Sequence, residues 1–179
     1  MSLRVLNAIP GFSREIGLCL AGMEEVRAQL GEAVAGLSPE QIGRQVVPEA
    51  HSIAALILHI GEAEWYWMQC IVSGCEVTDI IRNAAYWDSL EDPASFSQKA
   101  YSVDFCLNEI KKIREQTRAT LAAFDDSRLD QVFTWERRGA IQELSLRWIL
   151  HHLIDHEAQH KGQILLLKRL LGSEERPAA

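Results

Sequence analysis

The chain has 179 residues, of which 47% are hydrophobic and 24% charged, and its formal net charge is −7 at pH 7; this is typical of one soluble folded domain, expected over residues 1–179 with a short flexible tail at about 173–179. The acidic balance argues against a nucleic-acid partner, because Lys and Arg neutralise phosphates, and no apolar run approaches the ~20 residues that cross a membrane. Without a secretory signal pattern or a Cys-x-x-Cys pair, the sequence predicts a cytoplasmic protein with reduced thiols.

Two long helices are expected in the first half of the chain. The first is predicted at about residues 12–37, where apolar side chains recur every three or four positions. Residues 38–41, Ser-Pro-Glu-Gln, have the pattern of a capping box with proline at the first helical position, which predicts a short helical turn. The second long helix is expected at about residues 52–72, with Gly74 ending it.

The middle of the chain is less regular. Residues 75–101 contain several turn formers and no clear period, which indicates a long crossover with one short helix, and such connections often shape a pocket. Ser102 is a candidate cap for a third helix that reaches about Phe124.

Two further segments complete the chain. The apolar residues on either side of residues 137–139, Arg-Arg-Gly, indicate a small extended turn, since the alternation is too short to predict a strand. Ser145 is expected to cap a last helix that runs to about Leu171 and ends at Gly172. The predicted fold class is therefore all-α, a four-helix bundle with a long crossover between helices 2 and 3.

The last helix carries histidines at a spacing of four, His152, His156 and His160, followed by Gln163. Because four residues exceed one helical turn by only about 40°, these side chains share one side of the helix. Their neighbours are apolar, which argues for partial burial, where imidazoles need partners. Metal ligation is therefore favoured over a polar face turned to solvent.

A catalytic zinc site usually has three protein ligands, so a second segment must supply one. His59 is the best candidate because it is the one polar residue in the apolar run 53–60; a core histidine with an ordinary hydrogen-bond partner is the alternative. Glu62 lies about 60° from His59 on this helix, where it could bind metal, accept a hydrogen bond from an imidazole or, most simply, face solvent. Tyr66 lies within about 40° of His59.

Residues 156–160 also match the His-Glu-x-x-His string of zinc proteases, in which the glutamate is the general base. Glu157, however, projects about 100° away from His156. The 19 residues that follow His160 contain no further histidine. A zinc protease is therefore a minor alternative.

A family resemblance rests on these same segments: the helix start at Ser52, the residues from Leu58 to Glu64, and the last helix from His152 to Gly172. Together they resemble the DinB/YfiT-like superfamily over nearly the whole chain. The resemblance implies a four-helix bundle whose divalent metal is bound by His59, His156 and His160. It also implies thiol-dependent chemistry, since members include transferases and isomerases that use low-molecular-weight thiols.

Three neutral imidazoles with an open coordination position suit Zn²⁺ or Ni²⁺, and such an ion lowers the pKa of a bound water or thiol. The leading hypothesis is a metal-dependent enzyme of thiol S-transferase or hydrolase type that acts on a small molecule, with a low-molecular-weight thiol as a second cofactor. The alternative is a non-catalytic dimeric bundle with a structural metal; a homodimer is a candidate assembly.

No residue is assigned a catalytic role from the sequence. The expected residues around the metal or in its pocket are His152, Glu62, Tyr66 and Gln163. Trp87 and Trp135 are candidate walls of the pocket, although large aromatic residues more often belong to a core.

Overall fold

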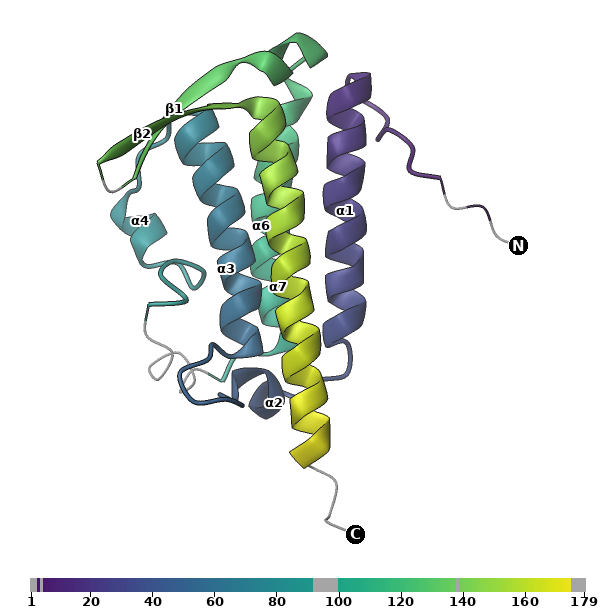
Figure 1. Cartoon of the computed structure of the whole chain (residues 1–179), viewed down its shortest axis with the longest axis vertical. Helices are drawn as coiled ribbons and strands as arrows, with labels where there is room; N and C mark the ends of the chain where they lie inside the picture. Colours follow the sequence, from purple (N-terminus) through teal and green to yellow (C-terminus); the bar gives the residue numbers. More distant parts are fainter. Residues whose placement is uncertain (1–2, 4, 92–99, 138, 175–179) are drawn as a thin grey trace.

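The computed structural model describes residues 3, 5–91, 100–137 and 139–174, so the expected tail lies outside the described residues from residue 175 onward. Four long helices lie side by side along the molecule (Figure 1): α1 (Arg14–Val34), α3 (Ile53–Trp65), α6 (Val103–Ala122) and α7 (Leu146–Glu174). Within the described residues, no helix has the length and apolar character needed to span a membrane.

Local sequence signals set most of the helix starts. Ser38 caps the short helix α2 (Pro39–Gly43) through the expected capping box, since its hydroxyl accepts from the Gln41 N–H and the Gln41 side chain accepts in return. Ser52, Ser102 and Ser145 each accept a hydrogen bond from the backbone N–H three residues later. Ser38, Ser102 and Ser145 cap as the sequence predicts, and Ser52 caps the helix that was expected to begin near it.

Two helices differ in part from expectation. The predicted second helix is continuous, but beyond α3 it becomes the π-helical segment η1 (Tyr66–Val72). The last helix passes Gly172 and reaches Glu174. Glycine inside a helix costs only about 1 kcal/mol, so without a left-handed cap at that position it does not end the helix.

The crossover between η1 and α6 contains the predicted short helix, α4 (Asp79–Arg82). Residues 92–99 of this crossover lie outside the described part of the chain. After α6, a 3₁₀ segment, η2 (Asp126–Asp130), leads into the strands.

The all-α expectation needs correction, because the chain is mainly helical with a small two-stranded sheet. Strands β1 (Val132–Arg137) and β2 (Ala140–Ser145) form an antiparallel hairpin in which Arg137 pairs with Ala140 and Val132 with Ser145. Gly139, at φ 77°, supplies the left-handed backbone that the tight turn requires. Most of β2 is exposed, so its residues need not alternate, and the alternation that marks a strand is missing from the sequence.

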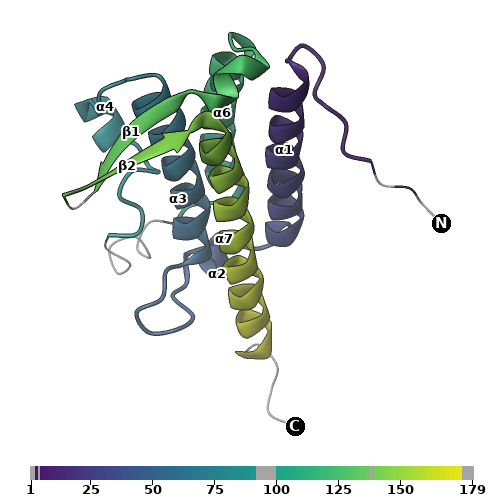
Figure 2. The same ribbon diagram turned by 45° about the horizontal axis from the view of Figure 1, so that its top comes forward.

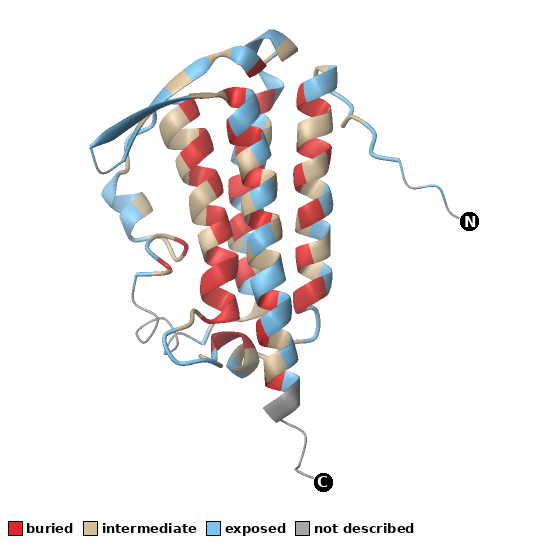
Figure 3. Cartoon of the chain, in the orientation of Figure 1, coloured by how far each residue is buried: buried red, intermediate tan, exposed pale blue. Residues whose placement is uncertain are grey.

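The hairpin lies across one end of the helices, over α3 and α7, as the tilted view in Figure 2 shows. Buried residues line the inner sides of the helices (Figure 3). They form two apolar clusters, one toward the hairpin and one toward α2. The hairpin-end cluster includes Leu20, Met23, Met68, Leu121 and Leu153. The α2-end cluster includes Leu30, Ile42, Ile60, Ile110 and Ile164.

Between the two clusters along each long helix stands one charged side chain: Arg27 on α1, Glu64 on α3, Arg114 on α6 and Glu157 on α7. Both carboxylates are 2% exposed and Arg114 is 4% exposed. Arg27 and Arg114 each donate hydrogen bonds to both carboxylates, at distances that include 2.9 Å from Arg27 Nη2 to Glu64 Oε2 and 3.2 Å from Arg114 Nη2 to Glu157 Oε2. We call these four residues the buried ion network; it joins all four long helices.

One glycine lets two of the helices approach closely. A Cβ atom at Gly61 of α3 would lie 2.6 Å from Ile110 Cγ2 of α6, well inside van der Waals contact. The absence of a side chain at Gly61 therefore sets the spacing of α3 and α6 beside the charged residues.

Candidate metal centre

His59 from α3 meets His156 and His160 from α7. One nitrogen of each imidazole lies within 4.8 Å of the corresponding nitrogen of the others, and Nε2 of His156 is 3.1 Å from Nε2 of His160. The His59 ring centroid is 5.1 Å from each of the other two. The α7 pair is close because four residues make about one turn, and α3 packs against α7.

The opposite nitrogens of two of these rings are held by neighbouring side chains. His59 Nδ1 is 3.0 Å from Glu62 Oε2, and His160 Nδ1 is 2.9 Å from Gln163 Oε1. Because carboxylate and amide oxygens accept hydrogen bonds, these contacts favour the tautomer with the proton on Nδ1 and the lone pair on Nε2. This is the arrangement that orients histidine ligands around a metal.

Glu62 is not simply a carboxylate that faces solvent, which was the simplest interpretation of the sequence. Its second oxygen, Oε1, accepts a hydrogen bond of 2.9 Å from the backbone N–H of Asp88. Asp88 belongs to the crossover and has a positive φ of 51°. Glu62 therefore ties the crossover to His59.

The two candidate metal ligands of α7, His156 and His160, have lowered pKa values, which favour the neutral imidazole. Burial, helped by the neighbouring rings of His160, His59 and His152, lowers the pKa of His156 to about 3. Burial also lowers the pKa of His160, against the opposing effect of its hydrogen bond to Gln163. Neutral imidazoles are the form that binds metal ions.

The donor set fits a divalent ion. At Zn–N distances of about 2.0–2.1 Å, tetrahedral coordination places two ligand nitrogens about 3.3 Å apart, close to the 3.1 Å between the Nε2 atoms of His156 and His160. Among the described residues, these three histidines are the one group of three or more His, Cys, Asp or Glu side chains that could hold a metal ion. A four-coordinate ion on them would keep one position for another molecule.

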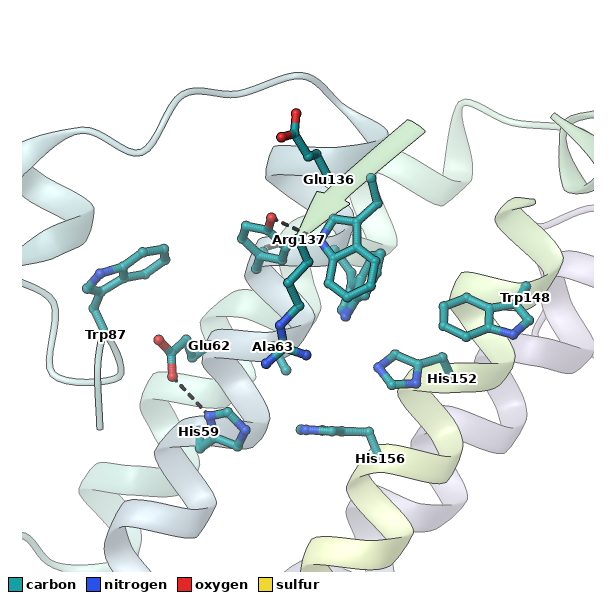
Figure 4. Close-up of a pocket in the computed structure, with 12 residues that line it drawn as sticks. His59, Glu62, Ala63, Trp87, Glu136, Arg137, Trp148, His152 and His156 are labelled. Atoms are coloured by element: carbon teal, nitrogen blue, oxygen red, sulfur yellow. Dashed lines mark hydrogen bonds and ion pairs between the residues drawn. The ribbon is translucent and has the colours of Figure 1, made fainter. Parts of the chain in front are cut away.

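A pocket of about 560 Å³ opens beside this centre (Figure 4). His59 and His156 lie at its inner end, and His152 forms part of its wall, stacked on Trp148 with ring centroids 4.9 Å apart. Tyr66 also lines it and accepts a hydrogen bond of 3.2 Å from Trp135 Nε1. The remaining lining residues are Glu62, Ala63, Trp67, Trp87, Glu136 and Arg137.

The predicted site residues thus come together, but two of them, His160 and Gln163, are not among the residues that line the pocket. His152, Glu62 and Tyr66 line the pocket, as do both candidate wall tryptophans. Gln163 is not among the lining residues and instead contacts His160 from the side toward α2.

Residues of the pocket, and one neighbour of His59 outside it, were missed by sequence reasoning. Trp148 lies four residues before His152, so the helical period places it on the same face, and Arg137 lies two residues after Trp135 on one strand. His51, just before α3, lies close enough to His59 that burial and this neighbour lower its pKa. The spacing of Trp148 and Arg137 was a usable signal; for His51 the sequence offers none.

Glu157 does not face the pocket. It is 2% exposed and hydrogen-bonded to Arg27 and Arg114 in the buried ion network. The carboxylate that would act as general base in a zinc protease is therefore committed to two arginines on the other side of α7.

Comparisons with known proteins identify the family of the chain and a shared fold. The family profile described as Mycothiol-S-transferase matches residues 19–172. A solved structure described as "Crystal structure of the conserved protein of locus from Enterococcus faecalis" has a TM-score of 0.67 at 14% sequence identity, covering 87% of this chain and 96% of that one, which shows a shared fold. A search among curated proteins finds no match. The resemblance to the DinB/YfiT-like superfamily is confirmed, and because the profile spans most of its length, the chain belongs to the mycothiol S-transferase family.

Proposed function

We propose that this protein is a metal-dependent thiol S-transferase, in which His59, His156 and His160 bind Zn²⁺ or Ni²⁺ and the pocket receives a low-molecular-weight thiol and an electrophile. The family name indicates mycothiol as the thiol. The observation that carries the proposal is the convergence of the three imidazoles beside a pocket that His59 and His156 line, with the Nδ1 atoms of His59 and His160 held by other side chains.

A bound divalent ion supplies Lewis acidity, which lets a thiol lose its proton near neutral pH. The protein's own residues do the rest. Glu62 and Gln163 fix the orientation of two ligand rings. The aromatic side chains that line the pocket reduce the contact of a bound sulfur with water. In the overall reaction the S–H proton goes to solvent, the sulfur electron pair forms the new S–C bond, and the leaving group departs with its own pair.

The reacting thiol has to come from outside the protein. None of the described residues that line the pocket is a cysteine. All four cysteines are free, and burial raises the pKa of the Cys106 thiol to about 12, which keeps it protonated. A separate thiol substrate therefore suits the site better than a cysteine nucleophile of the chain.

A hydrolase would use the same centre with water in place of the thiol, and a structural metal would need no pocket. The adjoining 560 Å³ cavity favours a reacting centre over a structural one, and the family match favours a thiol over water. The proposed framework is a four-helix bundle with the hairpin added at one end.

The test combines metal content with thiol transfer. Zinc-loaded protein is incubated with mycothiol, cysteine or glutathione and a series of electrophiles, and the conjugates are identified by mass. His156→Ala and His160→Ala should each lose bound zinc and conjugate formation. His151→Ala, which removes an exposed histidine from the same helix, should change neither.

Full zinc binding by His156→Ala would contradict the ligand assignment. X-ray absorption showing four protein ligands, together with no conjugate from any thiol, would favour the structural alternative. Hydrolysis without thiol incorporation would favour the hydrolase.

A further inference from the structure

Arg137 places a positive charge over the pocket. On a strand, residues two apart face the same side, so Trp135 and Arg137 of β1 face the pocket together. The Arg137 guanidinium carbon lies 5.7 Å from the centre of the Trp135 ring. Figure 4 shows the Arg137 side chain extending toward the histidines, whereas Glu136 points away from them.

This charge has no anionic partner within the described part of the chain. The two acidic residues of the pocket lining are Glu62 and Glu136. Both oxygens of Glu62 are engaged, with His59 and with the Asp88 N–H. Glu136 is directed away, and no ion pair joins Arg137 to a described residue. The guanidinium is therefore available to a ligand.

The walls between Arg137 and the histidines are flat and apolar. Trp67 forms their centre, with its ring centroid 5.0 Å from that of Trp135 and 5.9 Å from that of Trp148. Trp87 and Tyr66 also line the space. Aromatic walls of this kind favour planar ligands, which can stack on them or meet their edges.

We propose that the pocket selects an electrophile composed of a planar apolar body and a carboxylate, with Arg137 binding the carboxylate. A single guanidinium pairs two parallel N–H groups with the two oxygens of a carboxylate, so one arginine suffices for this anion. The planar body lies against the tryptophans, and the far end of the molecule reaches the histidines. The role of this ligand as the electrophile rests on the proposed function. The binding of the carboxylate by Arg137 does not depend on that function.

The test is a binding measurement that needs no catalysis. 4-Nitrobenzoate and 4-nitrobenzamide have nearly the same shape and differ in charge, and a nitroarene that reaches the pocket should quench its tryptophan fluorescence. Both are titrated into the zinc-loaded full chain and again after chelation, which removes any direct bond between carboxylate and metal. We expect the benzoate to bind about tenfold more tightly than the amide in both states.

Arg137→Ala should bring the ratio of the two affinities close to one, and Arg137→Lys should retain part of it. Glu143→Gln is the matched control, since it changes the charge of an exposed residue of β2 that pairs with Thr134 and does not line the pocket, and it should keep the benzoate preference. Circular dichroism checks that each variant is folded.

Equal binding of the two probes by the unaltered protein, no binding of either, or a preference that survives Arg137→Ala would each overturn the proposal. The proposed function is judged separately, by conjugate formation with uncharged electrophiles. Thiol transfer without a carboxylate preference would remove only this inference, and a carboxylate preference without thiol transfer would remove only the proposed function.

Discussion

Glu157 offers the sharpest test of how the helices are held together. In the buried ion network, two arginines face two glutamates, and Glu157 accepts hydrogen bonds from both Arg27 and Arg114. Glu157→Gln keeps the shape but removes one of the two buried carboxylates, which leaves Arg27 with Glu64 and leaves Arg114 with Glu64 and the more exposed Glu24. Breaking a buried pair by removing one partner typically costs about 3–5 kcal/mol. We expect a loss of that order in the free energy of unfolding.

The measurement is urea unfolding followed by circular dichroism, with a chelator present so that metal binding does not contribute. Asp155→Asn is the matched control: it removes one negative charge from an exposed position of the same helix, and it should cost less than about 0.5 kcal/mol. A Glu157→Gln protein as stable as the control would refute the energetic role of the network. If that protein also lost all activity, Glu157 would instead be a catalytic base.

Three other measurements probe the site and the packing. Zinc affinity should fall on acidification, because the ligands must be neutral. Since the pKa values of His156 and His160 are lowered, their share of the loss should lie below the usual pKa of ~6.5. Calorimetry showing equal affinity at about pH 7.5 and about pH 3 would contradict histidine ligation. Glu62→Gln should weaken zinc binding roughly 10- to 100-fold, and unchanged affinity in a chelator competition would show that Glu62 does not orient His59. Gly61→Ala should cost about 1–3 kcal/mol by overpacking, whereas Gly162→Ala, which meets nothing within 4 Å, should be neutral or stabilising in the same urea titration.

The sequence was sufficient to select the three converging histidines, because each lies in a segment with a clear local signal. The spacing of four on α7 follows from the helical period, and His59 interrupts an apolar run. Their metal binding stays a prediction. The two helices could be paired because a metal site needs at least three ligands, and neither helix alone provides a complete set.

The buried ion network could not be derived in the same way. Glu64 occupies a place in the apolar stripe with Ile57, Ile60 and Met68, and this marks it as unusual. Its partner Arg114 cannot be identified from the sequence, because that pairing depends on how α6 is rotated about its own axis, which no local pattern encodes. The hairpin was missed for a related reason, since the exposure of β2 removes the alternation that predicts a strand.

The adjacency of His156 and Glu157 has a consequence for insertions and deletions. Neighbouring residues of α7 serve opposite sides of the helix, one the metal centre and the other the two arginines. A single residue gained or lost between Leu146 and His156 would turn all that follows by about 100°, so ligands and ion pairs would be lost together. Related proteins should therefore keep this segment at constant length, while length changes gather at the turn of the hairpin.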